Sequence, residues 1–135
     1  MAGLIDSSVV IEVERQRRPI GRLVGADDEP DDWAIAAMTA AELLVGVHRA
    51  DTEARRAQRA AFVEAVLARL PVVPFDLAAA RVYARLAAQL WSAGQPVAVP
   101  DLLIAATAIA GGREVVTHNL RDFGRIPGLR LRRLG

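Results

Sequence analysis

Short apolar segments alternate with helical segments along most of the chain, and this alternation restricts the folds available to it. Five segments have strand character: residues 2–6, 33–38, 71–75, 114–117 and 129–134. Helical patterns separate them, beginning with residues 7–17. Strands that alternate with helices favour a parallel sheet covered on both faces. We therefore predict one α/β domain over residues 1–135, with three α/β/α layers around a central parallel sheet of four to five strands.

Several helices in this scheme have recognisable boundaries. We expect one helix to begin at Thr39, directly after the strand 33–38, and another to run from about Thr52 to Arg69. A third carries an apolar stripe that we expect to face the core, formed by Leu77, Ala80, Ala84, Ala87 and Trp91. We assign both tryptophans to the core. The segment 101–110 is apolar on nearly every side, which is typical of a buried helix.

Composition narrows the functional classes. Hydrophobic residues make up 53% of the 135 residues, which argues against disorder. The chain has no cysteine, which excludes disulfides and thiolate metal sites. We find neither a membrane-spanning apolar run nor a signal-peptide pattern, so we expect a cytoplasmic protein. All 17 basic residues are arginines, which suit phosphate groups, whereas residues 27–32 form an acidic loop.

Acidic side chains fall where the predicted strands end. Asp6 ends the first strand, Glu42 lies one turn into the helix after the second, and Asp101 opens the buried helix. Asn119 and Asp122 follow the strand 114–117. The carboxyl ends of parallel strands meet at one edge of a sheet, where α/β proteins bind their ligands. We therefore expect these side chains to lie together.

Each acidic residue also has an ordinary structural explanation. Asp6 can cap the helix that follows it, and Thr39 with Glu42 matches the capping box T-x-x-E. Asp101 suits a first-turn position and Asp122 a turn. Three or four carboxylates at one edge, however, would raise one another's pKa values unless a cation neutralised them. An all-oxygen set favours Mg²⁺ or Mn²⁺, with Asp6, Glu42 and Asp101 as the expected ligands.

Four motifs in order resemble those of PIN-domain ribonucleases, and most closely those of VapC toxins from bacterial toxin–antitoxin pairs. They are LIDSS with Asp6, AELLVG with Glu42, PDLLIAA with Asp101, and VVTHNLRDF with Asn119 and Asp122. The resemblance covers essentially the whole chain. Many family members carry an aspartate where Asn119 stands. Either Asp122 completes the acidic set or Asn119 is a neutral ligand, and the resemblance does not choose between one metal ion and two.

The resemblance implies a metal-dependent endoribonuclease that hydrolyses RNA phosphodiester bonds and inhibits translation. It assigns the catalytic set to Asp6, Glu42, Asp101, Asn119 and Asp122. The bound metal would polarise the scissile phosphate and activate a water. Contacts to the phosphate or to the acidic residues are expected from Ser7, Thr117 and Arg121. The resemblance also implies a homodimer and a small VapB-like antitoxin, which we expect on the helices between Thr39 and Leu70.

Two other functional classes share some of these features. A Mg²⁺-dependent phosphotransfer domain also gathers acids at strand ends. Such domains generally rely on a lysine, which this chain lacks, and Asp6-Ser7-Ser8 does not supply the second aspartate of a D-x-D motif. A PIN-like binding module without catalysis is the second alternative, and Asn119 keeps it open. We assign no chemistry to His48 or to His118.

Overall fold

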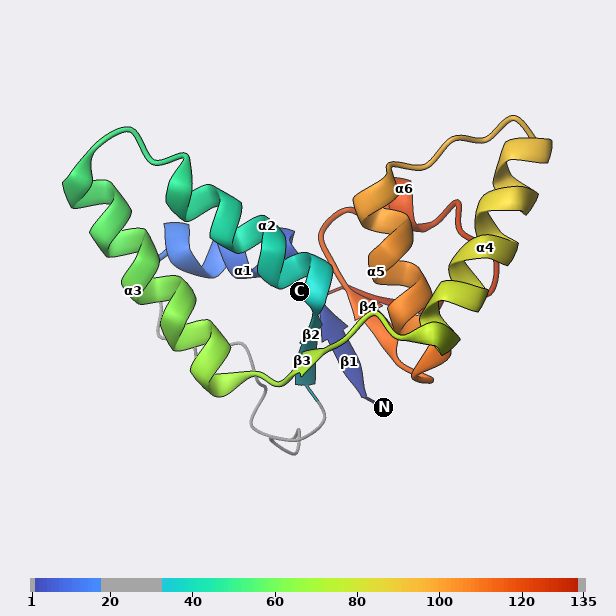
Figure 1. The fold of residues 1–135 in the computed structure, drawn as a ribbon, viewed down its shortest axis with the longest axis horizontal. Coiled ribbons are helices and arrows are strands. Elements are labelled where there is room, and N and C mark those ends of the chain that lie inside the picture. The colour runs from blue at the N-terminus through green and yellow to red at the C-terminus, as the bar shows by residue number, and fades with distance from the viewer. Residues whose placement is uncertain (1, 18–32, 134–135) are drawn as a thin grey trace.

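The structure, a computed structural model, describes residues 2–17 and 33–133. The predicted acidic loop at 27–32 lies outside these residues. Within them, parallel strands form one sheet in the order β3-β2-β1-β4-β5 (Figure 1). The strands are β1 (Gly3–Ile5), β2 (Trp33–Ala36), β3 (Val72–Val73), β4 (Glu114–Val116) and β5 (Leu131–Arg132). The helices are α1 (Ser7–Arg15), α2 (Ala37–His48), α3 (Glu53–Arg69), α4 (Leu77–Ser92), α5 (Val99–Ala110) and α6 (Leu120–Phe123). None of the described helices is long and apolar enough to cross a membrane.

The sheet lies between two groups of helices. Figure 1 shows α1, α2 and α3 on one side of the strands and α4, α5 and α6 on the other. Successive strand residues point to opposite faces. Leu4 and Val115 accordingly belong to the core cluster under α4, α5 and α6, while Ile5 and Val116 belong to the cluster under α1, α2 and α3. The predicted three-layer α/β/α class with a parallel sheet is confirmed.

The register of the central strands brings residues far apart in sequence to one edge. β1 pairs with both β2 and β4, and Ile5 lies opposite Val116. The backbone N–H of Asp6 then donates to the carbonyl of Val116 at 2.9 Å. Asp6 and Thr117 therefore leave the sheet side by side at its carboxyl edge.

The predicted boundary between the second strand and its helix was wrong. β2 ends at Ala36, and α2 already begins at Ala37, so Thr39 lies inside the first turn. Ala36 holds the N-cap position in an extended conformation and makes no side-chain cap bond. Ala37 and Met38 are good helix formers, and β1 offers pairing only opposite Trp33 and Ala34. Apolar composition alone did not separate the buried strand from the buried start of the helix.

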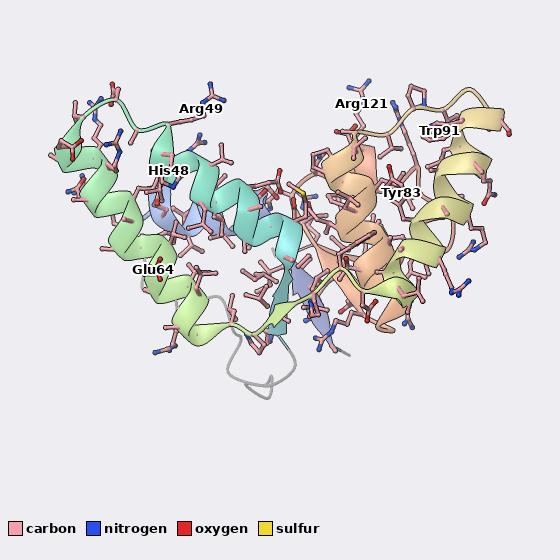
Figure 2. All side chains as sticks on the ribbon, in the orientation of Figure 1. His48, Arg49, Glu64, Tyr83, Trp91 and Arg121 are labelled. Carbon is pink, nitrogen blue, oxygen red and sulfur yellow. The ribbon has the colours of Figure 1, made fainter. Side chains whose placement is uncertain are left out.

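The predicted core stripe of α4 is confirmed at Ala87 but was wrong at its two ends, Leu77 and Trp91. The buried residues of this helix are Ala79, Leu86, Ala87 and Leu90. Leu77 and Trp91 are 67% and 68% exposed, and Trp91 stands at the outer end of α4 (Figure 2). This alanine-rich helix carries two apolar faces, and packing against α5 buries the one that includes Leu86 and Leu90. Trp33, by contrast, is buried as predicted.

The predicted start of the third helix is confirmed and gives a stability prediction. Thr52 is the N-cap of α3, and its Oγ1 accepts from the backbone N–H of Arg55 at 3.1 Å. Thr52→Ala is expected to lower the free energy of unfolding by about 1 kcal/mol, because that N–H loses its partner. Urea denaturation measures the change. Thr52→Ser, which keeps the hydroxyl, is the control, and equal losses in both variants would contradict the capping role.

Candidate active site

Asp6 occupies the turn between β1 and α1 and is only 3% exposed. It holds the N-cap position of α1, yet its side chain makes no capping hydrogen bond. Instead, Oδ2 of Asp6 accepts from Ser8 Oγ at 2.8 Å and from Thr117 Oγ1 at 2.9 Å. The explanation of Asp6 as a helix cap is therefore wrong. The carboxylate is held in place by two hydroxyls on two different elements.

The hydroxyl pair that holds Asp6 is itself fixed by the loop after β4. The backbone N–H of His118 donates to Ser8 Oγ at 3.2 Å, and that of Asn119 donates to Thr117 Oγ1 at 2.8 Å. Thr117 is fully buried. Each hydroxyl thus donates a hydrogen bond to Asp6 and accepts one from a backbone N–H. The orientation of the carboxylate depends on the pairing of β1 with β4.

Glu42 reaches the same edge from α2. Its Oε1 is buried and has no hydrogen-bond partner among the described residues, and the same is true of Thr39 Oγ1. Because Thr39 lies inside the helix rather than at its N-cap, the predicted capping box is not formed. Burial raises the pKa of Glu42, and the negative charges of Asp6 and Asp101 raise it further, while a hydrogen bond with Ser7 acts in the opposite direction.

Asp101 contributes a third carboxylate from the first turn of α5. Burial, followed by the charges of Asp6 and Asp122, raises the pKa of Asp101 to about 6. Asp122 in turn accepts from Asn119 Nδ2 at 3.1 Å. The structure therefore brings the predicted acids together around Asp101, which interacts with Asp6, Glu42 and Asp122. Asn119 lies beside them and positions Asp122.

These donors fit a hard divalent cation that keeps much of its water. In residues 2–17 and 33–133, no three His, Cys, Asp or Glu side chains form a group that could hold an ion together. Mg²⁺ is typically bound through one or two carboxylates, with water and substrate phosphate in the other positions. The partnerless Oε1 of Glu42 and the raised pKa values of Glu42 and Asp101 are the features that a cation would relieve.

Comparison with known proteins places this site in a family. The PIN-domain family model matches residues 3–129. Ribonuclease VapC5 of Mycobacterium tuberculosis is 40% identical over 127 residues, which cover 94% of this chain and 89% of that protein. The chain belongs to the PIN-domain family, in its VapC branch. The resemblance found in the four motifs is thereby confirmed, and the phosphotransfer class is set aside.

Solved VapBC structures have the same fold as this PIN domain. DNA-bound VapBC from Salmonella typhimurium has a TM-score of 0.86 at 30% identity, and the match covers 98% of both chains. VapBC-5 from M. tuberculosis, a member of the VapBC family of toxin–antitoxin systems, has a TM-score of 0.73 at 34% identity. That match covers 98% of this chain and 97% of the other.

Of the residues predicted to contact the phosphate or the acids, Ser7 and Thr117 lie at the acidic site and Arg121 lies on the surface of α6. Ser7 is half-buried beside Glu42, and Thr117 touches Asp6 directly. Arg121 is exposed on α6, pointing away from the rest of the molecule in Figure 2. Sequence reasoning missed Ser8, which holds Asp6 and receives the His118 N–H. The only sequence feature that could have pointed to Ser8 is its hydroxyl, two residues after Asp6.

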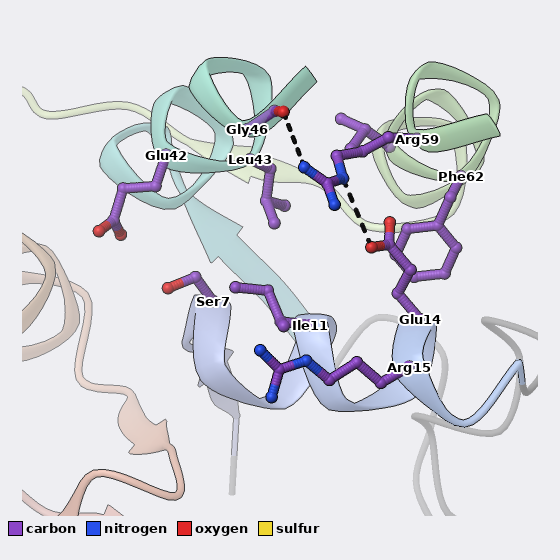
Figure 3. Close-up of a pocket in the computed structure, with 10 residues that line it drawn as sticks. Ser7, Ile11, Glu14, Arg15, Glu42, Leu43, Gly46, Arg59 and Phe62 are labelled. Carbon is purple, nitrogen blue, oxygen red and sulfur yellow. Dashed lines mark hydrogen bonds and ion pairs between the residues drawn. The ribbon is translucent and has the colours of Figure 1, made fainter. Parts of the chain in front are cut away.

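A cavity of about 400 Å³ adjoins the acidic edge between α1, α2 and α3 (Figure 3). Ser7 and Glu42 line it near the acids, and Ile11, Leu43 and Phe62 give it an apolar portion. Farther along, Arg59 donates to the carbonyl of Gly46 at 3.0 Å and lies 3.6 Å from the Glu14 carboxylate. The cavity thus joins a charged site to a partly apolar groove.

Proposed function

We propose that this chain is a Mg²⁺- or Mn²⁺-dependent endoribonuclease, acting as the toxin of a type II VapBC pair and inhibiting translation. The observation that carries the proposal is the buried Asp6 carboxylate, held by two hydroxyls and accompanied by Glu42, Asp101 and Asp122. The names of its VapC relatives as ribonucleases support the same activity. The substrate is an RNA phosphodiester, and the proposal includes a cytoplasmic location.

The side chains divide the work of such a site. Asp6, Glu42 and Asp101 would hold the hydrated divalent ion, one or two of them directly and the rest through its bound water, with Asp6 oriented by Ser8 and Thr117. When bound, the ion supplies Lewis-acid polarisation of the phosphodiester and a water of lowered pKa. Asn119 holds Asp122 next to Asp101, so Asp122 adds negative charge without being free to turn away. In this arrangement Asn119 is a positioning residue, and Asp122 is the fourth acid of the site.

The proposal includes two protein partners. Related structures are VapBC complexes, which supports a VapB-like antitoxin as one partner. We place that antitoxin on α2 and α3, where the cavity beside Glu42 offers apolar walls. The second partner is another copy of the chain. An antitoxin on this surface would cover the approach to Glu42.

The direct test uses the purified chain, freed of any antitoxin, with total bacterial RNA. We expect discrete cuts with Mg²⁺ or Mn²⁺ and none when divalent ions are chelated. Sequencing of the cut ends would then identify the target. Divalent binding, detected by calorimetry, without cleavage of any RNA would instead favour a catalytically silent binding module and would refute the proposed activity.

Loss of the Thr117 hydroxyl is expected to impair cleavage without removing any acid. Thr117→Val keeps the shape of the side chain but leaves Asp6 with Ser8 as its remaining hydroxyl partner. Changes of this kind around metal ligands typically lower metal affinity or activity by about 10- to 100-fold. The measurement is the cleavage rate over a Mg²⁺ titration, with Thr117→Ser as the control. Wild-type rates in Thr117→Val would contradict an orienting role.

A further inference from the structure

A second cavity, of about 500 Å³, lies on the other flank of α1. It is lined by Ser8, Ile11, Glu12, Arg15, Gln16 and His118. Ser8 connects this cavity to the proposed catalytic site, because the same Oγ donates to Asp6 and accepts the His118 N–H. A molecule bound here would lie against Ser8, whose hydroxyl donates to the Asp6 carboxylate. The first cavity reaches the acids through Ser7 and Glu42 instead.

Arg15 provides an uncommitted positive charge next to this acidic edge. It lines both cavities, and Figure 3 shows its guanidinium reaching back along α1 toward Ile11. In the described part of the chain, Arg15 has no hydrogen-bond or ion-pair partner. The neighbouring acids are engaged elsewhere: Glu12 accepts from Gln16 at 2.7 Å, and Glu14 faces Arg59. A free guanidinium of this kind suits a phosphate group.

The same cavity also offers a flat ring and an apolar side chain. His118 is exposed. Its backbone N–H donates to Ser8 Oγ, and this hydrogen bond fixes the position of the His118 backbone relative to Asp6. Ile11 is 40% exposed and also lines the cavity. Unstacked RNA bases bind by stacking on aromatic rings, including histidine, and by contact with apolar surface. The cavity therefore combines a phosphate donor with a surface for a base.

We propose that this cavity holds the nucleotide next to the scissile phosphate of the RNA strand, with Arg15 on its phosphate and with His118 and Ile11 against its base. The inference rests on the proposed ribonuclease function and deepens it. Four carboxylates at one edge repel an incoming polyanion, so a cation beside them is needed to hold the strand in place. The Arg15 guanidinium holds the phosphate backbone of the RNA, whereas the His118 ring affects which base is accepted.

Binding can be measured separately from cleavage. The probes are fluorescent single-stranded oligoadenylate and oligouridylate of equal length, with divalent ions chelated so that no cleavage occurs. Affinities of the full chain, freed of antitoxin, are followed as the salt concentration rises. Arg85→Ala is the matched control, because Arg85 is an exposed arginine on α4, on the far side of the sheet from α1 (Figure 1).

We expect Arg15→Ala to weaken binding about tenfold and to reduce the slope of log K against log salt by about 0.7, the value for one lost phosphate contact on a single strand. His118→Ala is expected to weaken binding about fivefold or more with an unchanged slope, since stacking carries no charge. His118→Phe should restore it. In cleavage assays with Mg²⁺, Arg15→Ala should raise KM more than it lowers kcat.

The outcomes separate this inference from the function on which it rests. If the wild-type chain binds and cuts RNA while Arg15→Ala and His118→Ala behave like Arg85→Ala, the nucleotide site is wrong and the ribonuclease proposal stands. If the wild-type chain neither binds nor cuts any RNA, the proposed function fails and the inference fails with it. A weakened Arg15→Ala with an unchanged salt slope would also overturn the phosphate contact.

Discussion

Replacing Asp6 with asparagine is expected to lower RNA cleavage by about 10³-fold or more, the largest effect expected from any single substitution in this chain. Asparagine keeps the size of the side chain and can still meet the hydroxyls of Ser8 and Thr117. It removes the negative charge through which the site would hold a divalent ion. The measurement is the single-turnover cleavage rate with saturating RNA across a Mg²⁺ and Mn²⁺ series.

The same substitution is expected to leave the fold intact or to stabilise it. The charge of Asp6 helps to raise the pKa values of both Glu42 and Asp101. Asp6→Asn removes that repulsion, so both pKa values should move down toward their ordinary range. An NMR titration of the side-chain carboxyl carbons detects the change. Lost cleavage together with an unchanged or higher melting temperature would identify a functional rather than a structural role.

A matched surface substitution controls for the loss of one negative charge. Asp51 is 69% exposed and pairs with Arg55 at 2.8 Å, an exposed ion pair of the kind that contributes little. Asp51→Asn is expected to change neither cleavage nor melting temperature measurably. If Asp6→Asn also retained wild-type cleavage, the assignment of the active site to this edge of the sheet would be wrong.

The position of the acidic site was predictable because it depends on topology. Parallel strands separated by helices must carry their carboxyl ends at one edge, whatever the details of packing. Asp6, Glu42 and Asp101 each lie within two turns of a strand end or at the start of a helix, so small errors in boundaries did not move them off that edge. The second helix begins two residues earlier than predicted, and Glu42 still reaches the site.

The contacts within the site were not predictable from local sequence. The bond from Thr117 to Asp6 spans 111 residues and depends on the register of β1 with β4. A hydroxyl at the end of a strand has no local feature that distinguishes a support for a carboxylate from an ordinary strand end. The role of Ser8 was missed for the same reason. The error in α4 is different, because alanine is compatible with either face of a helix and the partner helix decides which is buried.

The metal-free protein is expected to lose stability as the pH rises from about 4 to about 6 and then to level off. Burial and negative neighbours raise the pKa of Asp101 from 3.8 to about 6. Between these values the folded state holds a proton that the unfolded state has released. The free energy of unfolding therefore falls with rising pH in this window. Glu42 acts in the same direction, because its pKa is also raised.

The size of the effect follows from the shift and from exposure. A shift of two pKa units corresponds to about 3 kcal/mol, and because Asp101 is only half-buried, screening by solvent reduces this to about 1–2 kcal/mol. Urea denaturation in a chelating buffer at several pH values measures it. Asp101→Asn should be more stable than wild type at about pH 7.5, should show a flatter pH profile, and should cleave RNA poorly. Equal pH profiles for the two proteins would contradict the cause assigned here.

Divalent ions should reverse this loss only where the carboxylates are ionised. Addition of Mg²⁺ or Mn²⁺ at about pH 7.5 is expected to raise the melting temperature, because an ion that binds the folded state alone stabilises it. At about pH 5 the rise should be smaller, since Asp101 then holds a proton that competes with the ion. Sodium chloride of equal ionic strength separates site binding from general screening. Asp101→Asn lacks the negative charge that the ion would neutralise, so its melting temperature should rise only slightly with the ion at both pH values. A rise as large as that of the wild type would show that the ion does not bind at Asp101.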